Sequence, residues 1–280
     1  MNRPDAAANP PEAATPAGRE ALAAIAADRA HTLVALDFDG TLSPIVPDPE
    51  QARAHPDVLP ALRRLAPLVG TVAVITGRPA EVAVAHAGFA GQPGLEHLIV
   101  LGAYGAERWE AATGETIAAA PPPGVAAVRA ELPGLLAELG APEGTWIEDK
   151  HRALAVHTRR TADPEGAWRL LHDPLYKLAE RHELTVEPGK MVLELRPPGM
   201  DKGAALTALV RERGARSLLY AGDDLGDVPA FAAGERLRAE GVPALLLACG
   251  APPVDELATR ADVVVPDPGA VAAYLAALAD

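Results

Sequence analysis

Two acidic residues stand two positions apart directly after a short apolar run. Residues 33–36 are Leu-Val-Ala-Leu, Asp37 and Asp39 follow on either side of a phenylalanine, and Gly40 comes next. Side chains alternate between the faces of a strand, so an extended backbone would project Asp37 and Asp39 the same way. Open α/β sheets bind ligands just beyond the carboxyl ends of their strands. The pair therefore indicates a site for a divalent cation.

Three more polar segments come at predicted strand ends or at the start of a predicted helix: Thr76-Gly77-Arg78, Lys202-Gly203, and Asp223-Asp224 with Asp227 nearby. If the strands lie side by side, these segments converge on one crevice. Carboxylates would hold a hard cation, while a hydroxyl and an ammonium group would donate to an anion. Mg²⁺ suits this set of groups, because it binds a few carboxylates together with the oxygens of a substrate phosphate.

Each segment alone has a simpler interpretation. An Asp-x-Asp pair in a turn is most often a solvated loop, and a Lys-Gly step usually lies on the surface. Asp224 could simply cap the following helix. Four such segments in this order, each at a strand end or a helix start, favour a common site instead.

Alternating strand-like and helix-like segments position these groups. The predicted strands are 33–36, 71–75, 98–101, 217–221, 244–247 and 263–265. The predicted helices between and after them are 57–68, 79–87, 201–213 and 268–278. This alternation is typical of a doubly wound, Rossmann-like α/β core, with a parallel sheet covered on both faces.

The middle of the chain has a different pattern. Strand-like segments at 108–110, 115–117, 146–150, 154–157, 184–187 and 191–195 surround helices at 125–139 and 164–181. We expect an α+β insert at 108–197 with its own small sheet, containing Trp109 and Trp146 in its core. The catalytic core then comprises 19–107 and 198–280. Residues 1–18, rich in Ala and Pro, are predicted to be a disordered extension.

Composition excludes several classes of function. The net charge of −13 is unfavourable for binding a nucleic acid or an anionic membrane. No apolar run is long enough to span a membrane, and the N-terminal residues lack a basic region followed by an apolar core, so we expect no signal peptide. The single cysteine, Cys249, is predicted to be a buried structural thiol in a reducing compartment. We expect a cytoplasmic protein without nucleic-acid or membrane partners.

The four segments resemble the signature motifs of the haloacid dehalogenase superfamily of phosphatases. The order matches, and the insert lies between the second and third motifs. The resemblance implies a Rossmann-like core with an inserted cap of the C2 type, and a reaction through an aspartyl-phosphate. Asp37 would be the nucleophile and Asp39 the general acid and base.

The same resemblance assigns the other residues of the site. Mg²⁺ would be held by Asp37, Asp223 and the backbone carbonyl of Asp39. The phosphoryl group would be bound by Thr76 and Lys202, which the resemblance counts among the catalytic residues, together with Asp37, Gly40 and Gly77. Asp224 and Asp227 would orient Lys202 or metal-bound water.

Segments outside these motifs resemble the trehalose-6-phosphate phosphatase family. They are 41–49, the Gly102-x-x-Gly105-x-Glu107 segment, the strands 146–150 and 157–159, and the hairpin 189–197. Tyr104 stands where many members have His. In extended geometry Glu148 and Lys150 share a face of one strand, and Lys190 and Glu194 share a face of another. By resemblance these four residues would hold the sugar, although solvated ion pairs are the simpler interpretation.

The resemblance implies a phosphatase that releases trehalose from trehalose 6-phosphate. Another sugar-phosphate phosphatase, acting on sucrose phosphate or a glycosylglycerol phosphate, remains open. A sugar phosphomutase and a non-enzymatic carbohydrate-binding module are further alternatives. We expect a monomer whose partner is a small sugar phosphate, and a functional coupling to a trehalose-6-phosphate synthase remains open. Hinges near 107 and 198 would let the cap close and expel water.

Overall fold

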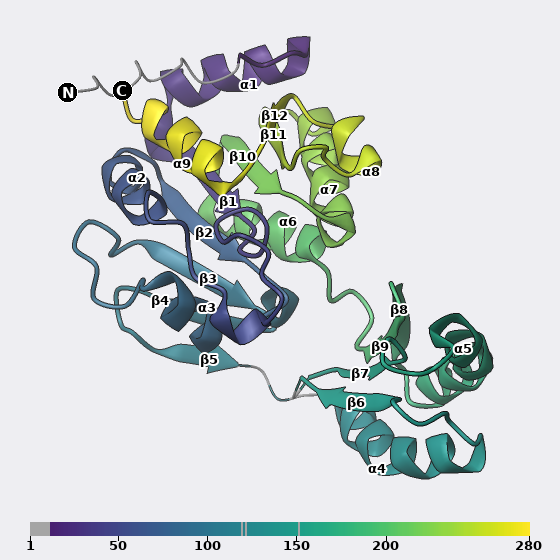
Figure 1. Ribbon diagram of the computed structural model, residues 1–280. Helices are drawn as coiled ribbons and strands as arrows, with labels where there is room; N and C mark the ends of the chain where they lie inside the picture. Colours follow the sequence, from purple (N-terminus) through teal and green to yellow (C-terminus); the bar gives the residue numbers. More distant parts are fainter. Residues whose placement is uncertain (1–11, 119, 121, 151) are drawn as a thin grey trace, which may run out of the picture. The chain divides into compact units, whose positions relative to one another are not determined.

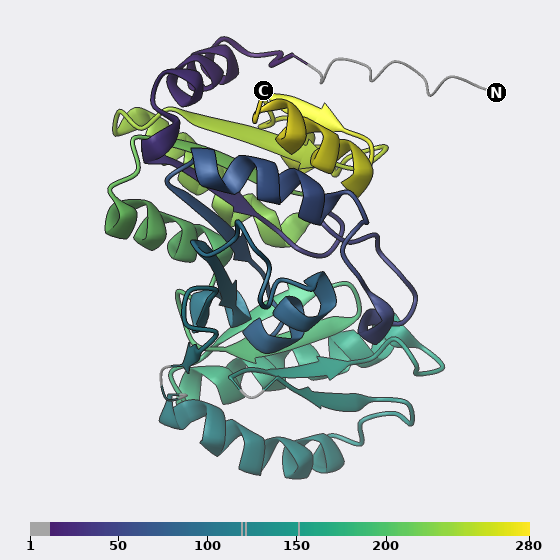
Figure 2. The ribbon, with the colours of Figure 1, turned by 90° about the vertical axis from the view of Figure 1, so that its left-hand side faces the viewer.

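The computed structural model describes residues 12–118, 120, 122–150 and 152–280. The chain divides into two units, one formed by Met1–Ala118 with Asp201–Asp280 and the other by Ala119–Met200. Figure 1 shows the helices and strands of each unit, and Figure 2 shows them from a second side. Each unit has its own sheet and its own hydrophobic core.

The first unit contains an eight-stranded sheet in the order β12-β11-β10-β1-β2-β3-β4-β5. Its strands are β1 (Thr32–Leu36), β2 (Thr71–Ile75), β3 (Leu98–Gly102), β4 (Glu107–Glu110), β5 (Thr116–Ala118), β10 (Ser217–Gly222), β11 (Ala244–Cys249) and β12 (Val263–Val265). The strands from β12 to β3 are parallel, whereas β4 and β5 continue the sheet in antiparallel pairing. The predicted parallel α/β core is confirmed.

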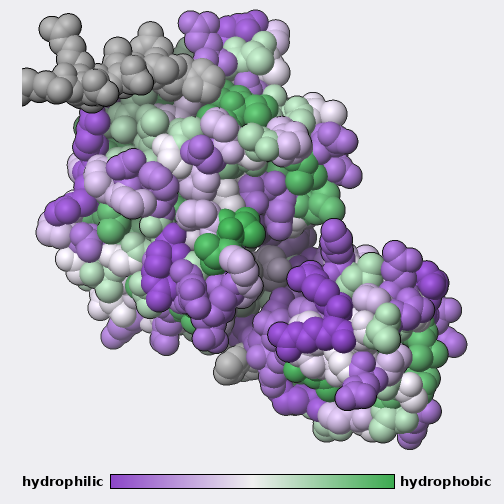
Figure 3. All heavy atoms as spheres, in the orientation of Figure 1, coloured by the Kyte–Doolittle hydropathy of each residue, from purple (hydrophilic) through white to green (hydrophobic). Residues whose placement is uncertain are grey.

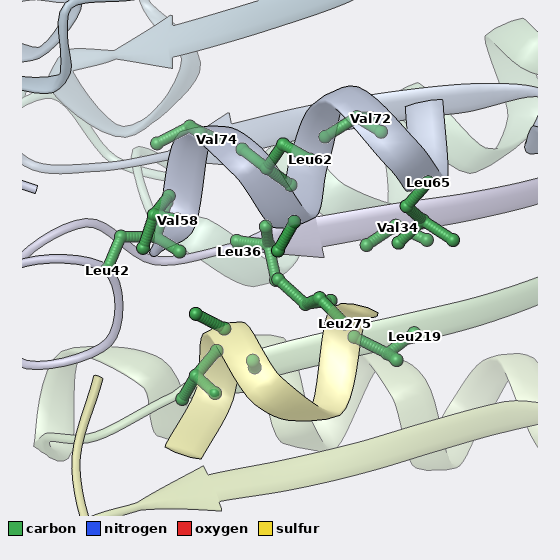
Figure 4. Packing of buried hydrophobic residues seen from close by; sticks show 14 of the residues in the cluster. Val34, Leu36, Leu42, Val58, Leu62, Leu65, Val72, Val74, Leu219 and Leu275 are labelled. Carbon is green, nitrogen blue, oxygen red and sulfur yellow. The ribbon is translucent and has the colours of Figure 1, made fainter. Parts of the chain in front are cut away.

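Helices cover both faces of this sheet. One face packs against α1 (Pro16–Ala27), α2 (Val58–Leu65), α3 (Ala80–Ala87) and α9 (Pro268–Ala277). The other packs against α6 (Lys202–Arg213), α7 (Val228–Ala239) and α8 (Asp255–Ala258). All of β1 is buried, with Val34 and Leu36 in one core and Leu33 and Ala35 in the other. Figure 4 shows Leu36 between α2 and α9. Two-sided burial explains why the strands are continuously apolar.

Short 3₁₀ turns join several of these elements. They are η1 (Arg29–His31), η2 (Pro49–Gln51), η3 (Ala66–Leu68), η4 (Ala103–Gly105) and η5 (Leu225–Asp227). Two of them, η4 and η5, follow the carboxyl ends of β3 and β10 and contribute to the site described below.

The second unit is a four-stranded antiparallel sheet with helices on one face. The sheet has the order β6 (Trp146–Asp149), β7 (Leu154–His157), β9 (Val192–Arg196) and β8 (Thr185–Gly189). Its apolar face packs against α4 (Pro123–Glu138) and α5 (Pro164–Arg181). Across the sheet, Glu148 and Glu194 stand in one row, each in register with Ala155. Figure 3 shows hydrophilic residues over much of the surface in view.

The boundary between the units differs from the prediction. β4 and β5 were expected in the insert, but β4 pairs with β3 and so extends the first unit to Ala118. Trp109 lies in β4, is 4% exposed and packs in the core of the first unit instead. Without β4, β3 would be the edge strand of the parallel sheet. The strand that follows it in sequence can fold back antiparallel and pair with the backbone N–H and C=O groups of that edge.

The N-terminal segment also differs in part from the predicted extension at 1–18. Thr15 caps α1 by accepting a hydrogen bond from Gly18 N at 2.9 Å, and Pro16 begins the helix. Buried Ala21 and Ile25 anchor α1 against the sheet. A threonine directly before a proline commonly starts a helix, whereas the high Ala and Pro content of this segment had favoured the prediction of disorder. Residues 1–11 lie outside the described part of the chain. None of the helices within that part is both long and apolar enough to cross a membrane.

Candidate active site

The carboxyl ends of β1 and β10 bring the first acidic residues together. These strands are parallel neighbours, with Leu36 in register with Ala221, and Asp37 N donates to Ala221 O at 2.9 Å. Asp37 therefore follows β1 at the same edge of the sheet where Asp223 follows β10. Parallel strands end at a common edge, so residues far apart in sequence meet there.

A buried lysine connects two of the acids. Lys202 Nζ lies 2.6 Å from Asp37 Oδ1 and 2.7 Å from Asp227 Oδ1. Lys202 begins α6, where Asp201 caps the helix by accepting from Ala204 N at 2.8 Å. Asp37, Lys202 and Asp227 are 3%, 5% and 0% exposed. Charges so deeply buried are retained only when they are paired, and here one ammonium is shared by two carboxylates.

Asp227 uses both of its oxygens to hold neighbouring groups. Besides Lys202, Oδ1 accepts from the Tyr220 hydroxyl at 2.6 Å. Oδ2 accepts from the backbone N–H groups of Asp223 and Asp224, at 2.9 and 3.2 Å. Asp227 thus fixes the loop that carries Asp223, and its carboxylate has no free oxygen to offer a ligand.

The buried charges shift one another's ionisation. Burial raises the pKa of Asp37 well above its usual value, opposed by Lys202 and reinforced by Asp227 and Asp223. Burial and the neighbouring charges of Asp227 and Asp224 raise the pKa of Asp223 to about 7. For Lys202 burial acts to lower the pKa, but Asp227 and Asp37 outweigh it and raise the pKa well above normal. Lys202 is therefore held in its ammonium form. One ammonium does not neutralise all of the neighbouring carboxylates, so a further positive charge would favour their ionised forms.

A divalent cation fits this need. Carboxylate oxygens of Asp37, Asp223 and Asp227 lie within 4.8 Å of one another. Because the oxygens of Asp227 are already occupied, Asp37 and Asp223 are the available ligands. Gly40, at φ +80°, keeps the space open, since a Cβ there would lie 1.9 Å from Asp223 Oδ2. An all-oxygen set of this kind suits a hard cation.

Asp39 does not join this cluster, contrary to the expected common direction of the two acids. The strand ends at Leu36, and a turn follows in which Gly40 N donates to Ser43 O at 2.7 Å. Asp39 instead forms a bidentate ion pair with Arg78, at 2.6 and 2.7 Å. Asp37 and Asp39 therefore pair with two different cations, and Arg78, whose role was not predicted, belongs to the site.

The turn Thr76–Arg78 is held by the loop after β3. Thr76, 1% exposed, accepts from Arg78 N through Oγ1 at 3.1 Å. Tyr104 N donates to Thr76 O at 3.0 Å, and Ala103 N to Arg78 O at 2.8 Å. Ala103 and Tyr104 adopt left-handed φ angles of 47° and 57°. A Cβ on Gly77 would lie 2.8 Å from the Tyr104 hydroxyl, so a larger residue there would have to displace the end of that side chain.

The predicted sugar residues all lie in the second unit. Glu148 and Glu194 stand in one row across its sheet, each in register with Ala155. Glu194 is 7% exposed and pairs with Lys150 at 2.5 Å, and Glu148 pairs with His157 at 2.8 Å. Within the described residues, Glu194 Oε1 has no hydrogen-bond partner. A buried carboxylate oxygen of this kind is costly unless a ligand satisfies it.

Lys190 lies elsewhere than expected. β8 continues to Gly189 and β9 begins at Val192, so Lys190 is in the turn between them and does not share a strand with Glu194. Its backbone carbonyl accepts from Arg159 at 3.3 Å, and its side chain is exposed. The strands of this hairpin were predicted at 184–187 and 191–195, but β8 continues through Pro188 and Gly189, so the turn is shorter than predicted.

Comparison with known proteins agrees with the geometry. The sequence model of the trehalose-phosphatase family matches residues 35–263, from β1 to β12. The chain belongs to the trehalose-phosphatase family. This confirms the family that the motifs indicated, and it places the end of β1, all of β10 and the whole second unit within one matched segment.

Three curated relatives are similar over most of the chain. A trehalose-phosphate phosphatase of Mycolicibacterium paratuberculosis is 36% identical over 77% of this chain and 54% of its own length. A probable trehalose-phosphate phosphatase of Sinorhizobium fredii is 30% identical, covering 79% and 80%. The trehalose-6-phosphate phosphatase of Escherichia coli is 31% identical, covering 72% and 73%. The match thus spans about half the length of the mycobacterial relative.

Solved structures share the fold. The trehalose-6-phosphate phosphatase of Aspergillus fumigatus superposes with a TM-score of 0.70 at 25% identity, over 96% of this chain and 99% of that one. The C-terminal domain of the trehalose-6-phosphate phosphatase of C. albicans gives 0.71 at 22% identity, over 97% and 99%. A haloacid dehalogenase-like hydrolase from Bacteroides thetaiotaomicron gives 0.61 at 16% identity, over 88% and 98%. The haloacid dehalogenase fold is therefore established for this chain.

Proposed function

We propose that this chain hydrolyses trehalose 6-phosphate to trehalose and phosphate, with a divalent cation. One observation carries the proposal: Asp37 follows β1 beside Asp223, in contact with Lys202, in a chain of the trehalose-phosphatase family. The arrangement supplies a nucleophilic oxygen, ligands for a cation and a positive charge for a phosphate in one buried place.

In the first step a carboxylate oxygen of Asp37 attacks phosphorus. A P–O bond forms to Asp37 as the bond between phosphorus and the sugar oxygen breaks, and the leaving oxygen takes a proton from Asp39. Lys202 and Thr76 hold the phosphoryl oxygens, with the backbone N–H of Gly77. Gly40 N already donates to Ser43 O at 2.7 Å, so Gly40 serves the phosphoryl group by leaving room for it. Asp39 accepts from Arg78 through both oxygens as a carboxylate, so it must leave that pair and take up a proton from solvent before it can protonate the sugar oxygen.

In the second step water attacks the aspartyl-phosphate. Asp39, now ionised, accepts the proton of the water, the bond between phosphorus and Asp37 breaks, and phosphate leaves. Both carboxylates return to their starting states. Arg78 is placed to hold both oxygens of Asp39 when that residue is ionised.

The cation would be held by Asp37, Asp223 and the backbone carbonyl of Asp39, and we assign it to Mg²⁺. When bound, it offsets the repulsion between the Asp37 carboxylate and the phosphate. Asp227 holds Lys202 and the loop of Asp223, and Asp224 caps η5 by accepting from Gly226 N at 2.9 Å. These contacts support an orienting role for both acids.

The polar face of the second unit supplies the sugar contacts. Glu148, Lys150 and Glu194 share that face, and a disaccharide offers hydroxyls to carboxylates and ammonium groups alike. Oε1 of Glu194, which has no hydrogen-bond partner among the residues that the structure describes, is the feature that most supports this assignment. We also assign a sugar contact to Lys190, which lies in the turn between β8 and β9.

A panel of sugar phosphates tests the proposal. We expect phosphate release from trehalose 6-phosphate to exceed release from sucrose phosphate, glucosylglycerol phosphate and glucose 6-phosphate. Equal rates on sucrose phosphate and trehalose 6-phosphate would show that the protein is a phosphatase of broader specificity. Isomerisation of a hexose phosphate without free phosphate would identify a mutase, and binding without any turnover would identify a non-enzymatic module.

A further inference from the structure

Tyr220 is a polar residue in the middle of the buried sheet. It lies in β10, where it is in register with Ala35 of β1 and Leu246 of β11, and it is 0% exposed. Its ring meets Phe231 edge to face, with centroids 5.9 Å apart and planes at 87°. The ring is thus fixed on several sides, and its hydroxyl can serve only the group that it faces.

That group is Asp227, whose acceptor positions are all filled. A carboxylate has about four lone-pair sites, two on each oxygen. Two backbone N–H groups occupy Oδ2, while Lys202 and Tyr220 occupy Oδ1 at 2.7 and 2.6 Å. Burial, and then the nearby negative charge of Asp227, raises the pKa of Tyr220 well above normal, so the hydroxyl stays a donor.

We infer that Tyr220 is a positioning residue for catalysis, which directs Lys202 toward Asp37 by occupying the remaining acceptor site of Asp227. The inference rests on the proposed function, because Lys202 is taken as a ligand of the phosphoryl group. Without the hydroxyl, Asp227 would have a vacant acceptor in a place closed to water. The Lys202 ammonium is the nearest donor that could turn to fill it, and it would move away from Asp37.

Two isosteric substitutions separate this role from general packing. Tyr220→Phe removes only the hydroxyl, and Tyr274→Phe removes a hydroxyl from another buried tyrosine of the same unit, 3% exposed and located in α9. With the cation bound, we expect Tyr220→Phe to lower the affinity for inorganic phosphate and kcat/KM for trehalose 6-phosphate by about 10- to 100-fold. Tyr274→Phe should change neither at a temperature below unfolding.

A double-mutant cycle with Lys202→Met supplies the decisive measurement. If Tyr220 acts through Lys202, Tyr220→Phe should have no further effect on phosphate affinity, by calorimetry, once the ammonium is gone. The inference is overturned by an equal loss with and without the ammonium, or by a phosphate affinity unchanged in Tyr220→Phe. If Lys202→Met does not fold, the comparison of Tyr220→Phe with Tyr274→Phe decides.

Phosphate binding also separates this inference from the proposed function. Inorganic phosphate carries no sugar, so its affinity reports on Lys202 whichever phosphate ester is the substrate. Failure to hydrolyse trehalose 6-phosphate would refute the proposed function and leave the phosphate measurement valid. Normal hydrolysis with no effect of Tyr220→Phe would refute only the role of Tyr220.

Discussion

Lys202 donates to Asp37 and Asp227 at nearly equal distances, 2.6 and 2.7 Å, in a place closed to solvent. One ammonium therefore balances two carboxylates, and Asp223 adds a third acid beside them. The remaining negative charge explains both the raised pKa values and the fit of a divalent cation.

Asp37→Asn should abolish turnover, because the amide keeps the shape of the side chain and loses the nucleophilic oxygen. We expect kcat to fall at least about 10⁴-fold, as for other nucleophiles, while trehalose 6-phosphate still binds. Phosphate release and calorimetric titration measure the two effects. Asp255→Asn, at an exposed position in α8, is the matched control and should keep full activity. Normal turnover in Asp37→Asn would refute the nucleophile assignment.

The stability of the metal-free protein should fall as the pH rises from about 4 to 7. The pKa of Asp223 is near 7 in the folded protein, against its usual 3.8, so the folded state binds more protons across this window. Stability then decreases by up to about 1.4 kcal/mol per pH unit for each such group. Calorimetric unfolding in chelator, at several pH values, measures the slope.

Two comparisons isolate that effect from other titrating groups. Asp223→Asn should flatten the slope, because the amide does not titrate. Saturating Mg²⁺ should stabilise the wild-type protein most at high pH, where it need not displace a proton. A wild-type slope in chelator that is no steeper than that of Asp223→Asn would contradict the assignment.

Gly40→Ala should weaken cation binding by about 10- to 100-fold, because the added Cβ would push the Asp223 carboxylate aside. Gly91→Ala is the control, since Gly91 also has positive φ but faces open space. Both variants share the strain of left-handed backbone, about 1–2 kcal/mol. The rise in unfolding temperature with added Mg²⁺ measures affinity, and equal responses of the two variants would exclude the steric argument.

Glu194→Gln should raise KM for trehalose 6-phosphate about 10-fold or more, because it removes the charge that a sugar hydroxyl would bind. Hydrolysis of p-nitrophenyl phosphate, which lacks the sugar, should not change. Glu148→Ala should behave likewise. Glu187→Gln is the control, since Glu187 is in the same row of the sheet but pairs with Arg196 at 2.7 Å. An unchanged KM in Glu194→Gln and Glu148→Ala would show that the sugar binds elsewhere.

Much of the first unit could be predicted from local pattern. β1 and β2 are continuous apolar runs, and α6 starts at the capping residue Asp201, so periodicity and caps identify them. The pairing of β4 with β3 could not be predicted in this way, because the residues 107–110 include one apolar side chain, that of Trp109, and show no alternating pattern. Which sheet such a strand joins depends on the edge that is free after folding.

The sequence identified most of the residues of the site, but it predicted only some of the contacts between them. The acids and Lys202 were found by their positions at strand ends and at a helix start. Arg78 and Tyr220 were missed as partners, although Tyr220 interrupts an apolar strand, which was the available signal. Polar side chains within hydrophobic segments are the ones whose partners only the folded chain identifies.

The sequence by itself determined the kind of chemistry and the elements that carry it, because strand ends and helix starts are encoded by neighbouring residues. Only the tertiary structure decided which charges meet. It placed Lys202 between Asp37 and Asp227, turned Asp39 to Arg78, and gave Glu194 a buried oxygen without a partner among the described residues. Such contacts depend on strand order and burial, and no local pattern encodes either of them.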